Sequence, residues 1–230
     1  MADKLEIEAE LQKLANSEVA FQSKNYLKSP FQFYGIRVPI LREISKKFKN
    51  LEIYDTYNLF DELWNSGYHE EMSLAIFILA FQNKKFDIET LKFLFPRLEK
   101  IKTWDHADYV ASDILGKMLL ENSWMNSELW KMSDSKNPWI RRISIVSNIW
   151  AIKKGKIELV FKLAEKLAYY ENIFVQKGTG WMLRECGKKE RLSARNFVLM
   201  HLDMKPAAFS YATERMKELK TEKRKFLKGK

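Results

Sequence analysis

The sequence is organised as a succession of helical segments that come in pairs, and this recurrence is the strongest constraint on its fold. From residue 54 onward the first members of the pairs begin near residues 54, 87, 125, 156 and 189, at steps of about 33, 38, 31 and 33 residues. A period of this length built from two helices is typical of a helical solenoid. We therefore predict an all-α fold made of antiparallel helix pairs. A four-helix bundle with added helices is the competing fold, which so many helices of similar length disfavour.

Composition supports the prediction of helices. The 230 residues include only 8 glycines and 5 prolines, which leaves little room for long irregular segments. The expected helices cover residues 4–21, 39–48, 54–65, 69–82, 87–99, 104–119, 125–132, 138–153, 156–170, 172–186, 189–202 and 206–220. We expect a single helical-repeat domain over residues 1–220, followed by a basic C-terminal tail over residues 221–230.

Several classes of protein are disfavoured by what the sequence lacks. It has no run of eighteen apolar residues and no start that resembles a signal peptide, so we expect a cytoplasmic protein without a membrane partner. Cys186 is the only cysteine, which rules out an internal disulfide. His69, His106 and His201 lie far apart and have no cysteine nearby, so we predict no metal site and no cofactor. Nothing in the sequence indicates more than a monomer.

The charge is distributed unevenly along the chain. Residues 1–115 contain 15 Lys and Arg against 18 Asp and Glu, a net charge of −3. Residues 116–230 contain 25 against 12, a net charge of +13. A basic half on an otherwise neutral protein favours a polyanionic partner such as nucleic acid. A basic surface that only aids solubility is the alternative.

Two short segments carry the candidate site residues. Trp104 and Asp108 stand four residues apart, so they share one strip of the helix that contains them. Lys177, Trp181 and Arg184 repeat the arrangement, with an aromatic side chain between two cations. If the segments pair as above, all five residues lie on the second helices of their pairs, and equivalent helices of a solenoid line one face.

Arg142 lies between these two segments, on the second helix of the intervening pair. We therefore expect it to line the same groove as Trp104, Asp108 and Trp181. A purely structural ion pair between Asp108 and Arg142 is the alternative, because a charge buried without a partner is costly.

The aromatic segment before residue 39 is a second unusual feature. Phe31, Phe33 and Tyr34, with Tyr26 upstream and Arg37 downstream, precede the N-terminus of an expected helix, a position that favours phosphate binding. A packed cap that covers the first helix pair explains the same residues equally well.

These segments together resemble the AlkD family of DNA alkylation repair glycosylases. The matching stretches are Pro30–Pro39 (PFQFYGIRVP), Leu63–Glu70 (LWNSGYHE), Trp104–Asp108 (WDHAD), Trp139–Arg142 (WIRR) and Phe174–Glu185 (FVQKGTGWMLRE). They occur in the order of the family and span residues 26–190. The Trp-x-x-x-Asp pair and the last stretch are the more specific of them.

The resemblance implies a right-handed superhelical solenoid of HEAT-like helix pairs with a concave, basic groove. It also implies hydrolysis of the N-glycosidic bond of cationic purines alkylated at N3 or N7 in double-stranded DNA, without base flipping. By this likeness Asp108 is the catalytic carboxylate, and Trp104 and Trp181 flank the damaged nucleotide.

DNA contacts follow from the same likeness and from charge. Arg142 would contact the backbone near the lesion, with Tyr26 and Arg184 in supporting roles, and Lys177 and Arg37 would add positive charge. Two other functions stay open at this point. One is a non-catalytic helical-repeat protein that binds DNA or a damaged or branched DNA structure, and the other is a protein-interaction scaffold.

Overall fold

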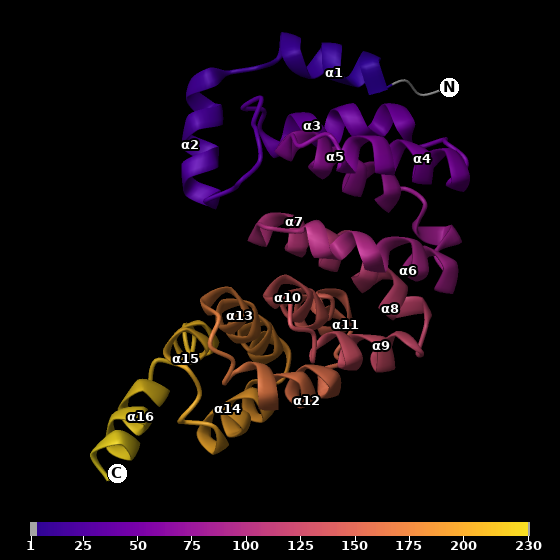
Figure 1. The fold of residues 1–230 in the computed structure, drawn as a ribbon. Coiled ribbons are helices and arrows are strands. Elements are labelled where there is room, and N and C mark those ends of the chain that lie inside the picture. The colour runs from indigo at the N-terminus through magenta and orange to yellow at the C-terminus, as the bar shows by residue number, and fades with distance from the viewer. Residues whose placement is uncertain (1–3, 230) are drawn as a thin grey trace. The chain divides into compact units, whose positions relative to one another are not determined.

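A computed structural model describes residues 4–229, and within them the only regular structure is helical (Figure 1). The chain divides into two compact units, with the boundary in the sequence between Ile114 and Leu115, and each unit is described by itself. An isolated bridge between Gln32 and Tyr68 is the one β-type pairing in the described residues. None of the helices in this part of the chain has the length and apolar character needed to cross a membrane.

The first unit, as described from residue 4, contains seven α-helices and is built around α5. The helices are α1 (Lys4–Lys13), α2 (Ser17–Leu27), α3 (Val38–Ser45), α4 (Ile53–Trp64), α5 (His69–Ala80), α6 (Ile88–Leu94) and α7 (Trp104–Tyr109). Helix α5 packs against α3, α4 and α7, and it is buried from His69 to Leu79. Burial of so long an apolar helix on all sides makes α5 the core of this unit.

The second unit is built around the long helix α13. Its helices are α8 (Gly116–Glu121), α9 (Met125–Met132), α10 (Pro138–Val146), α11 (Ile149–Lys153), α12 (Glu158–Leu167), α13 (Ile173–Lys189), α14 (Arg191–Met200), α15 (Pro206–Ala212) and α16 (Leu219–Lys228). Helix α13 packs against α10, α11, α12, α14 and α15. Helix α13 is therefore the central helix of the second unit, as α5 is of the first.

Gly180 lets α15 approach α13 closely. A Cβ atom at this position would lie 2.6 Å from the Cβ of Tyr211 and still closer to the carbonyl oxygen of Ala208. The backbone of α13 at Gly180 therefore contacts α15 directly. A larger residue at this position would force the two helices apart.

Three expected helices are interrupted or altered along their length. Residues 4–21 form α1 and α2 because the side chain of Asn16 caps α2, accepting a hydrogen bond from the Val19 amide at 3.0 Å. Residues 138–153 form α10 and α11, with a break at Ser147 and Asn148. Residues 104–119 pass through a π-helical turn, Val110–Leu115, which sequence periodicity does not reveal.

The C-terminal region also differs from the expectation. Helix α15 ends at Ala212, and residues 219–228 form the separate helix α16, so most of the segment expected to be a tail is helical. The apolar residue Leu219 is fully buried and anchors the start of this helix.

Candidate functional site

Helix α7 presents Trp104 and Asp108 on one strip and buries the residues between them. Trp104 and Asp108 are both partly exposed, whereas Asp105, His106 and Ala107 are buried. The i, i+4 spacing places an indole and a carboxylate beside each other at the surface, as the sequence predicts. The opposite side of the same turn fixes the helix in the core.

Tyr26 lies against Trp104. The two ring centroids are 6.0 Å apart and the planes meet at 86°, so the rings are in an edge-to-face contact. Tyr26 projects from α2 and is 75% exposed. The structure thus brings together two of the aromatic residues that the sequence singled out, from segments 78 residues apart.

The loop between α2 and α3 determines where α2 lies. Both carboxylate oxygens of Glu70 accept backbone N–H groups of this loop, from Tyr34 (3.1 Å), Gly35 (2.7 Å) and Ile36 (3.1 Å). Gly35 has a φ of 85°, and a Cβ there would lie 2.6 Å from the backbone nitrogen of Ala20 in α2. Only glycine suits this backbone conformation and this contact.

The aromatic loop is therefore a packed cap on the first unit. Its backbone N–H groups at residues 34–36 donate to a protein carboxylate, which is the role that a bound phosphate would otherwise fill. The carboxylate of Glu70 thus holds the loop that carries α2 toward Trp104.

Arg37 lies at the start of α3 beside a hollow in the first unit. Its side chain is exposed, and it lines a cavity of about 350 Å³ together with Phe33, His69 and Asp105. The cavity reaches the buried side of the turn that carries Trp104. Arg37 is thus near this turn and accessible to solvent.

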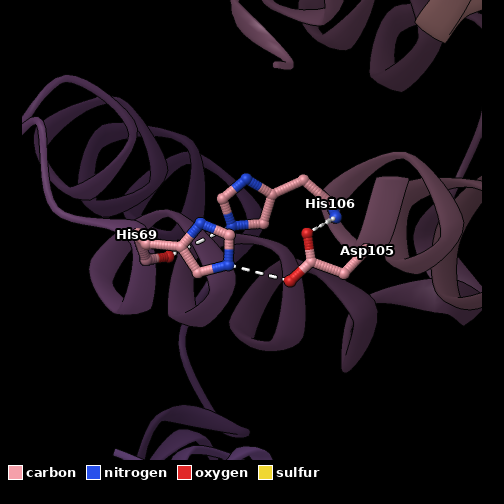
Figure 2. Close-up of side chains that lie close together, drawn as sticks. All are labelled: His69, Asp105 and His106. Atoms are coloured by element: carbon pink, nitrogen blue, oxygen red, sulfur yellow. Dashed lines mark hydrogen bonds and ion pairs between the residues drawn. The ribbon is translucent and has the colours of Figure 1, made fainter. Parts of the chain in front are cut away.

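A buried network of His69, Asp105 and His106 holds α7 on α5 (Figure 2). His69 Nε2 lies 2.8 Å from Asp105 Oδ2, and the other oxygen of this carboxylate accepts the backbone N–H of His106 at 2.9 Å. His106 Nε2 lies 3.1 Å from the backbone oxygen of His69, and it lies 3.0 Å from Ser73 Oγ. The two imidazoles stack with centroids 3.9 Å apart, and Phe33 stacks on the far side of His69 at 4.5 Å.

The charge states of this network follow from burial and hydrogen bonding. Burial lowers the pKa of His106 to about 3, so its imidazole is neutral at pH 7. Burial alone would raise the pKa of Asp105, but the hydrogen bond with His69 and the electrostatic interactions with His106 and His69 together outweigh burial, and the pKa lies well below its ordinary value. The ionised carboxylate of Asp105, one residue after Trp104, therefore holds this turn against α5 through its hydrogen bond with His69.

The three side chains offer possible metal ligands, with ligand atoms within 4.8 Å of one another. The lone pair of an imidazole nitrogen lies in the ring plane, and these rings are stacked with an interplanar angle of 18°. Parallel rings do not direct two lone pairs at one ion, and both oxygens of Asp105 already accept hydrogen bonds. The geometry is that of a hydrogen-bonded support.

Sequence reasoning missed this support. His69 and Asp105 are 36 residues apart, close to the spacing between helix pairs, so they occupy equivalent places on neighbouring helices. The signal in the sequence was that His69 and His106 stand at equivalent places of neighbouring helix pairs, which would have indicated that their side chains meet.

In the second unit, Arg142 is buried within α10 and directed at α13. Its Nη1 donates to the backbone oxygen of Phe174 at 2.6 Å, and the side chain is 6% exposed. A Cβ at Gly178 would meet Nη1 at 3.1 Å, so the guanidinium lies directly over this glycine. Contacts within the unit therefore fix the position of this charge.

Trp181 is partly exposed on α13. Its two cationic neighbours, Lys177 and Arg184, differ in whether carboxylates pair with them. Lys177 Nζ lies 5.9 Å from the ring centroid of Tyr211. Arg184 pairs with Glu214, and its Nε is 3.6 Å from Glu185. Lys177 thus keeps its charge next to Trp181, whereas carboxylates of the same unit already balance that of Arg184.

Comparison with known proteins identifies the family. The family model of the DNA alkylation repair enzyme matches residues 7–216, nearly the whole chain. Two solved structures have the same fold. A predicted DNA alkylation repair enzyme from Enterococcus faecalis is 20% identical with a TM-score of 0.76, covering 88% of this chain and 96% of its own. The protein smu.31 from Streptococcus mutans UA159 is 17% identical with a TM-score of 0.62, covering 88% and 98%.

The search of curated proteins gives no match. The family match extends over both units and includes Trp104, Asp108, Arg142 and Trp181. The chain therefore belongs to the DNA alkylation repair enzyme family.

Proposed function

We propose that the protein is a DNA glycosylase that hydrolyses the N-glycosidic bond of purines made cationic by alkylation at N3 or N7. The observation that carries this proposal is the outward strip of α7. It presents one carboxylate, Asp108, beside the indole of Trp104, on a turn locked from below by the His69–Asp105 hydrogen bond. Membership of a DNA alkylation repair family supports alkylated DNA as the substrate, and we propose that this DNA is double-stranded.

A single carboxylate suits this reaction. A purine alkylated at N3 or N7 is positively charged and leaves as a neutral base, so it needs no general acid, unlike a sugar leaving group. The remaining needs are to oppose the positive charge that develops on the deoxyribose and to orient a water molecule for attack. Asp108 would do both. At about 4 Å and an effective dielectric constant near 20, such a charge pair contributes roughly 4 kcal/mol.

The aromatic residues would bind the cationic base. A cation over an indole or phenol face gains about 0.5–2 kcal/mol. In the first unit Trp104 would provide such a face, and Tyr26 holds it from the edge. Trp181, which is partly exposed on α13 of the second unit, would offer DNA an aromatic face of its own. The damaged base then need not enter a closed pocket, so we propose catalysis without base flipping.

The cations would hold the phosphate backbone. Arg142 is pre-oriented by Phe174 and Gly178, so little conformational freedom is lost when its planar guanidinium meets phosphate oxygens. Lys177 and Arg37 add charge at the surface of their units. Arg184 would have to exchange Glu214 for a phosphate, so its contribution is the weakest of the four.

The test is release of 7-methylguanine or 3-methyladenine from alkylated duplex DNA by the Asp108→Asn variant. Loss of about 4 kcal/mol of transition-state stabilisation lowers the rate by roughly 1000-fold. Asp55→Asn is the matched control, because Asp55 is an exposed aspartate of α4 in the same unit. We expect this control to release base at the wild-type rate.

Equal release by wild type and Asp108→Asn would refute the proposal. Binding of duplex DNA with no release of base by the wild type would instead support a non-catalytic DNA-binding protein, which the charge of +13 over residues 116–230 also favours.

A further inference from the structure

The last helix, α16, carries a row of cations that the proposed catalysis does not use. Lys220, Arg224 and Lys228 follow one another at intervals of four residues, so they form a single strip along the helix. All three are exposed, and none makes an ion pair with another residue in the range 4–229. We call these three residues the α16 strip.

The opposite side of α16 is attached to the protein. Leu219 is fully buried, and the helix packs against α14. Lys223 donates to the backbone oxygen of Met204 at 3.1 Å and lies 4.2 Å from the ring centroid of Phe209. The α16 strip is therefore held facing outward by contacts made on the other side of the helix.

The positive charge of α16 is not balanced by the carboxylates on the helix or at its N-cap. Glu218 pairs with Arg191 of α14, and Glu222 pairs with Lys225 on the same helix. Neither carboxylate is left for the strip. A row of unbalanced cations at the surface fits a polyanion, because neutralising them releases the counterions condensed on it.

We propose that the α16 strip binds the phosphate backbone of duplex DNA. This contact does not depend on the base sequence, and it enlarges the DNA-binding surface of the second unit. Adjacent strip residues are separated by about 6 Å along the helix axis, since an α-helix rises about 1.5 Å per residue. Contacts of this kind position a protein on DNA without reading bases. The family match ends at residue 216, so this contact belongs to a segment that the family model does not include.

Duplex DNA suits the strip better than a membrane. A helix that lies in a membrane interface needs a free apolar face opposite its cations. Here that side is used against α14 and α15, and the exposed apolar residue of the helix is Leu227, 58% exposed and adjacent to Lys228. Charge alone would attract the helix to anionic lipid, so vesicles serve as the competing probe in the test.

The inference is tested by titrating an unmodified 20-base-pair duplex with the full-length triple variant Lys220→Gln, Arg224→Gln, Lys228→Gln over a range of salt concentrations. Loss of three phosphate contacts should weaken binding about 10- to 100-fold at 0.1 M salt and reduce the slope of log K against log salt by about 2 to 3. Glutamine is a good helix former, and circular dichroism verifies that the fold is kept.

The control removes the same charge elsewhere: Lys46→Gln, Lys92→Gln, Lys131→Gln. Each of these lysines is exposed and pairs with a glutamate three residues before it. If only net charge matters, both triple variants lose affinity equally and the inference fails. A Lys220→Arg, Lys228→Arg variant, which keeps the charge of the strip, should bind like the wild type.

Vesicles containing phosphatidylserine give the remaining outcome. If the strip variant loses vesicle binding but keeps wild-type affinity for DNA, the strip is a lipid contact and the inference is wrong.

The inference rests on DNA binding by this chain but not on base release. Wild-type base release with no effect of the strip would refute this inference alone, and strip-dependent binding without base release would refute only the glycosylase proposal.

Discussion

At the scale of single residues, the turn that carries Trp104 and Asp108 is defined as much by its buried side as by its exposed one. The sequence predicts the exposed pair from i, i+4 spacing, because that geometry is local to one helix. It does not reveal that His69, 36 residues earlier, bonds to Asp105 between them. Such a contact depends on how α5 and α7 pack, which helix periodicity alone does not determine.

His106 should make the stability of the protein depend on pH. Its folded-state pKa of about 3 lies below the ordinary value of 6.5, so the unfolded chain binds the extra proton. This contribution to stability is complete above pH 6.5 and is lost progressively as the pH falls toward 3. Between pH 7 and pH 5 the loss is about 2 kcal/mol, measurable by urea unfolding at each pH.

His106→Gln separates this effect from the rest of the protein. The variant should be less stable at pH 7, since it disturbs the contacts with Ser73 and His69, but it should lose about 2 kcal/mol less than the wild type between pH 7 and pH 5. Parallel pH profiles for the two proteins would show that His106 does not remain neutral in the folded state.

At the scale of helices, the positions where helices begin were predicted better than the interruptions within them. The helix over residues 125–132 was placed correctly, and α4, α5 and α13 begin within one residue of the expected positions. The errors lie where a side chain or a wider turn interrupts a continuous apolar pattern, as at Asn16 and in the π-helical turn Val110–Leu115. Hydrophobic spacing does not reveal these interruptions, because neither a capping side chain nor one wider turn alters the apolar pattern of the sequence.

The contact of α13 with α15 should depend on Gly180. An added methyl group there would lie 2.6 Å from Tyr211 Cβ, too close for either helix to keep its place. We expect Gly180→Ala to lower the free energy of unfolding by about 1–3 kcal/mol, measured by urea denaturation.

Gly187→Ala on the same helix is the matched control. A Cβ at Gly187 would lie 3.5 Å from Ala194 Cβ and 3.7 Å from Met216 Cε, which are ordinary contacts. Since alanine also favours helix over glycine by roughly 0.5–1 kcal/mol, this variant should be as stable as the wild type or more so. Equal destabilisation by both substitutions would mean that close packing at Gly180 is not the cause.

At the scale of the whole molecule, the two units differ in charge and each has its own central helix. Residues 116–230 carry a net charge of +13 and residues 1–115 a net charge of −3. The proposed carboxylate is in the unit with negative net charge, and the α16 strip is in the basic one. Sequence could predict this division of charge because it requires only a count along the chain, whereas the division into two units at Ile114 depends on which helices pack together.

Cys186 offers a way to follow the second unit alone. It is the only cysteine and is fully buried in α13, where burial, followed by the nearby charge of Glu185, raises the pKa of its thiol to about 12. At pH 8 the native protein should therefore react very slowly with a thiol reagent such as 5,5′-dithiobis(2-nitrobenzoate), because both access and ionisation require the unit to open.

The rate of this reaction should respond to changes in one unit and not in the other. In urea below the unfolding transition we expect Gly180→Ala, next to α15, to accelerate labelling of Cys186 by opening the second unit. His106→Gln destabilises the first unit and should leave the rate unchanged, because α1–α7 and α8–α16 form separate compact units. Equal acceleration by the two variants would instead show that the whole chain opens in one cooperative step.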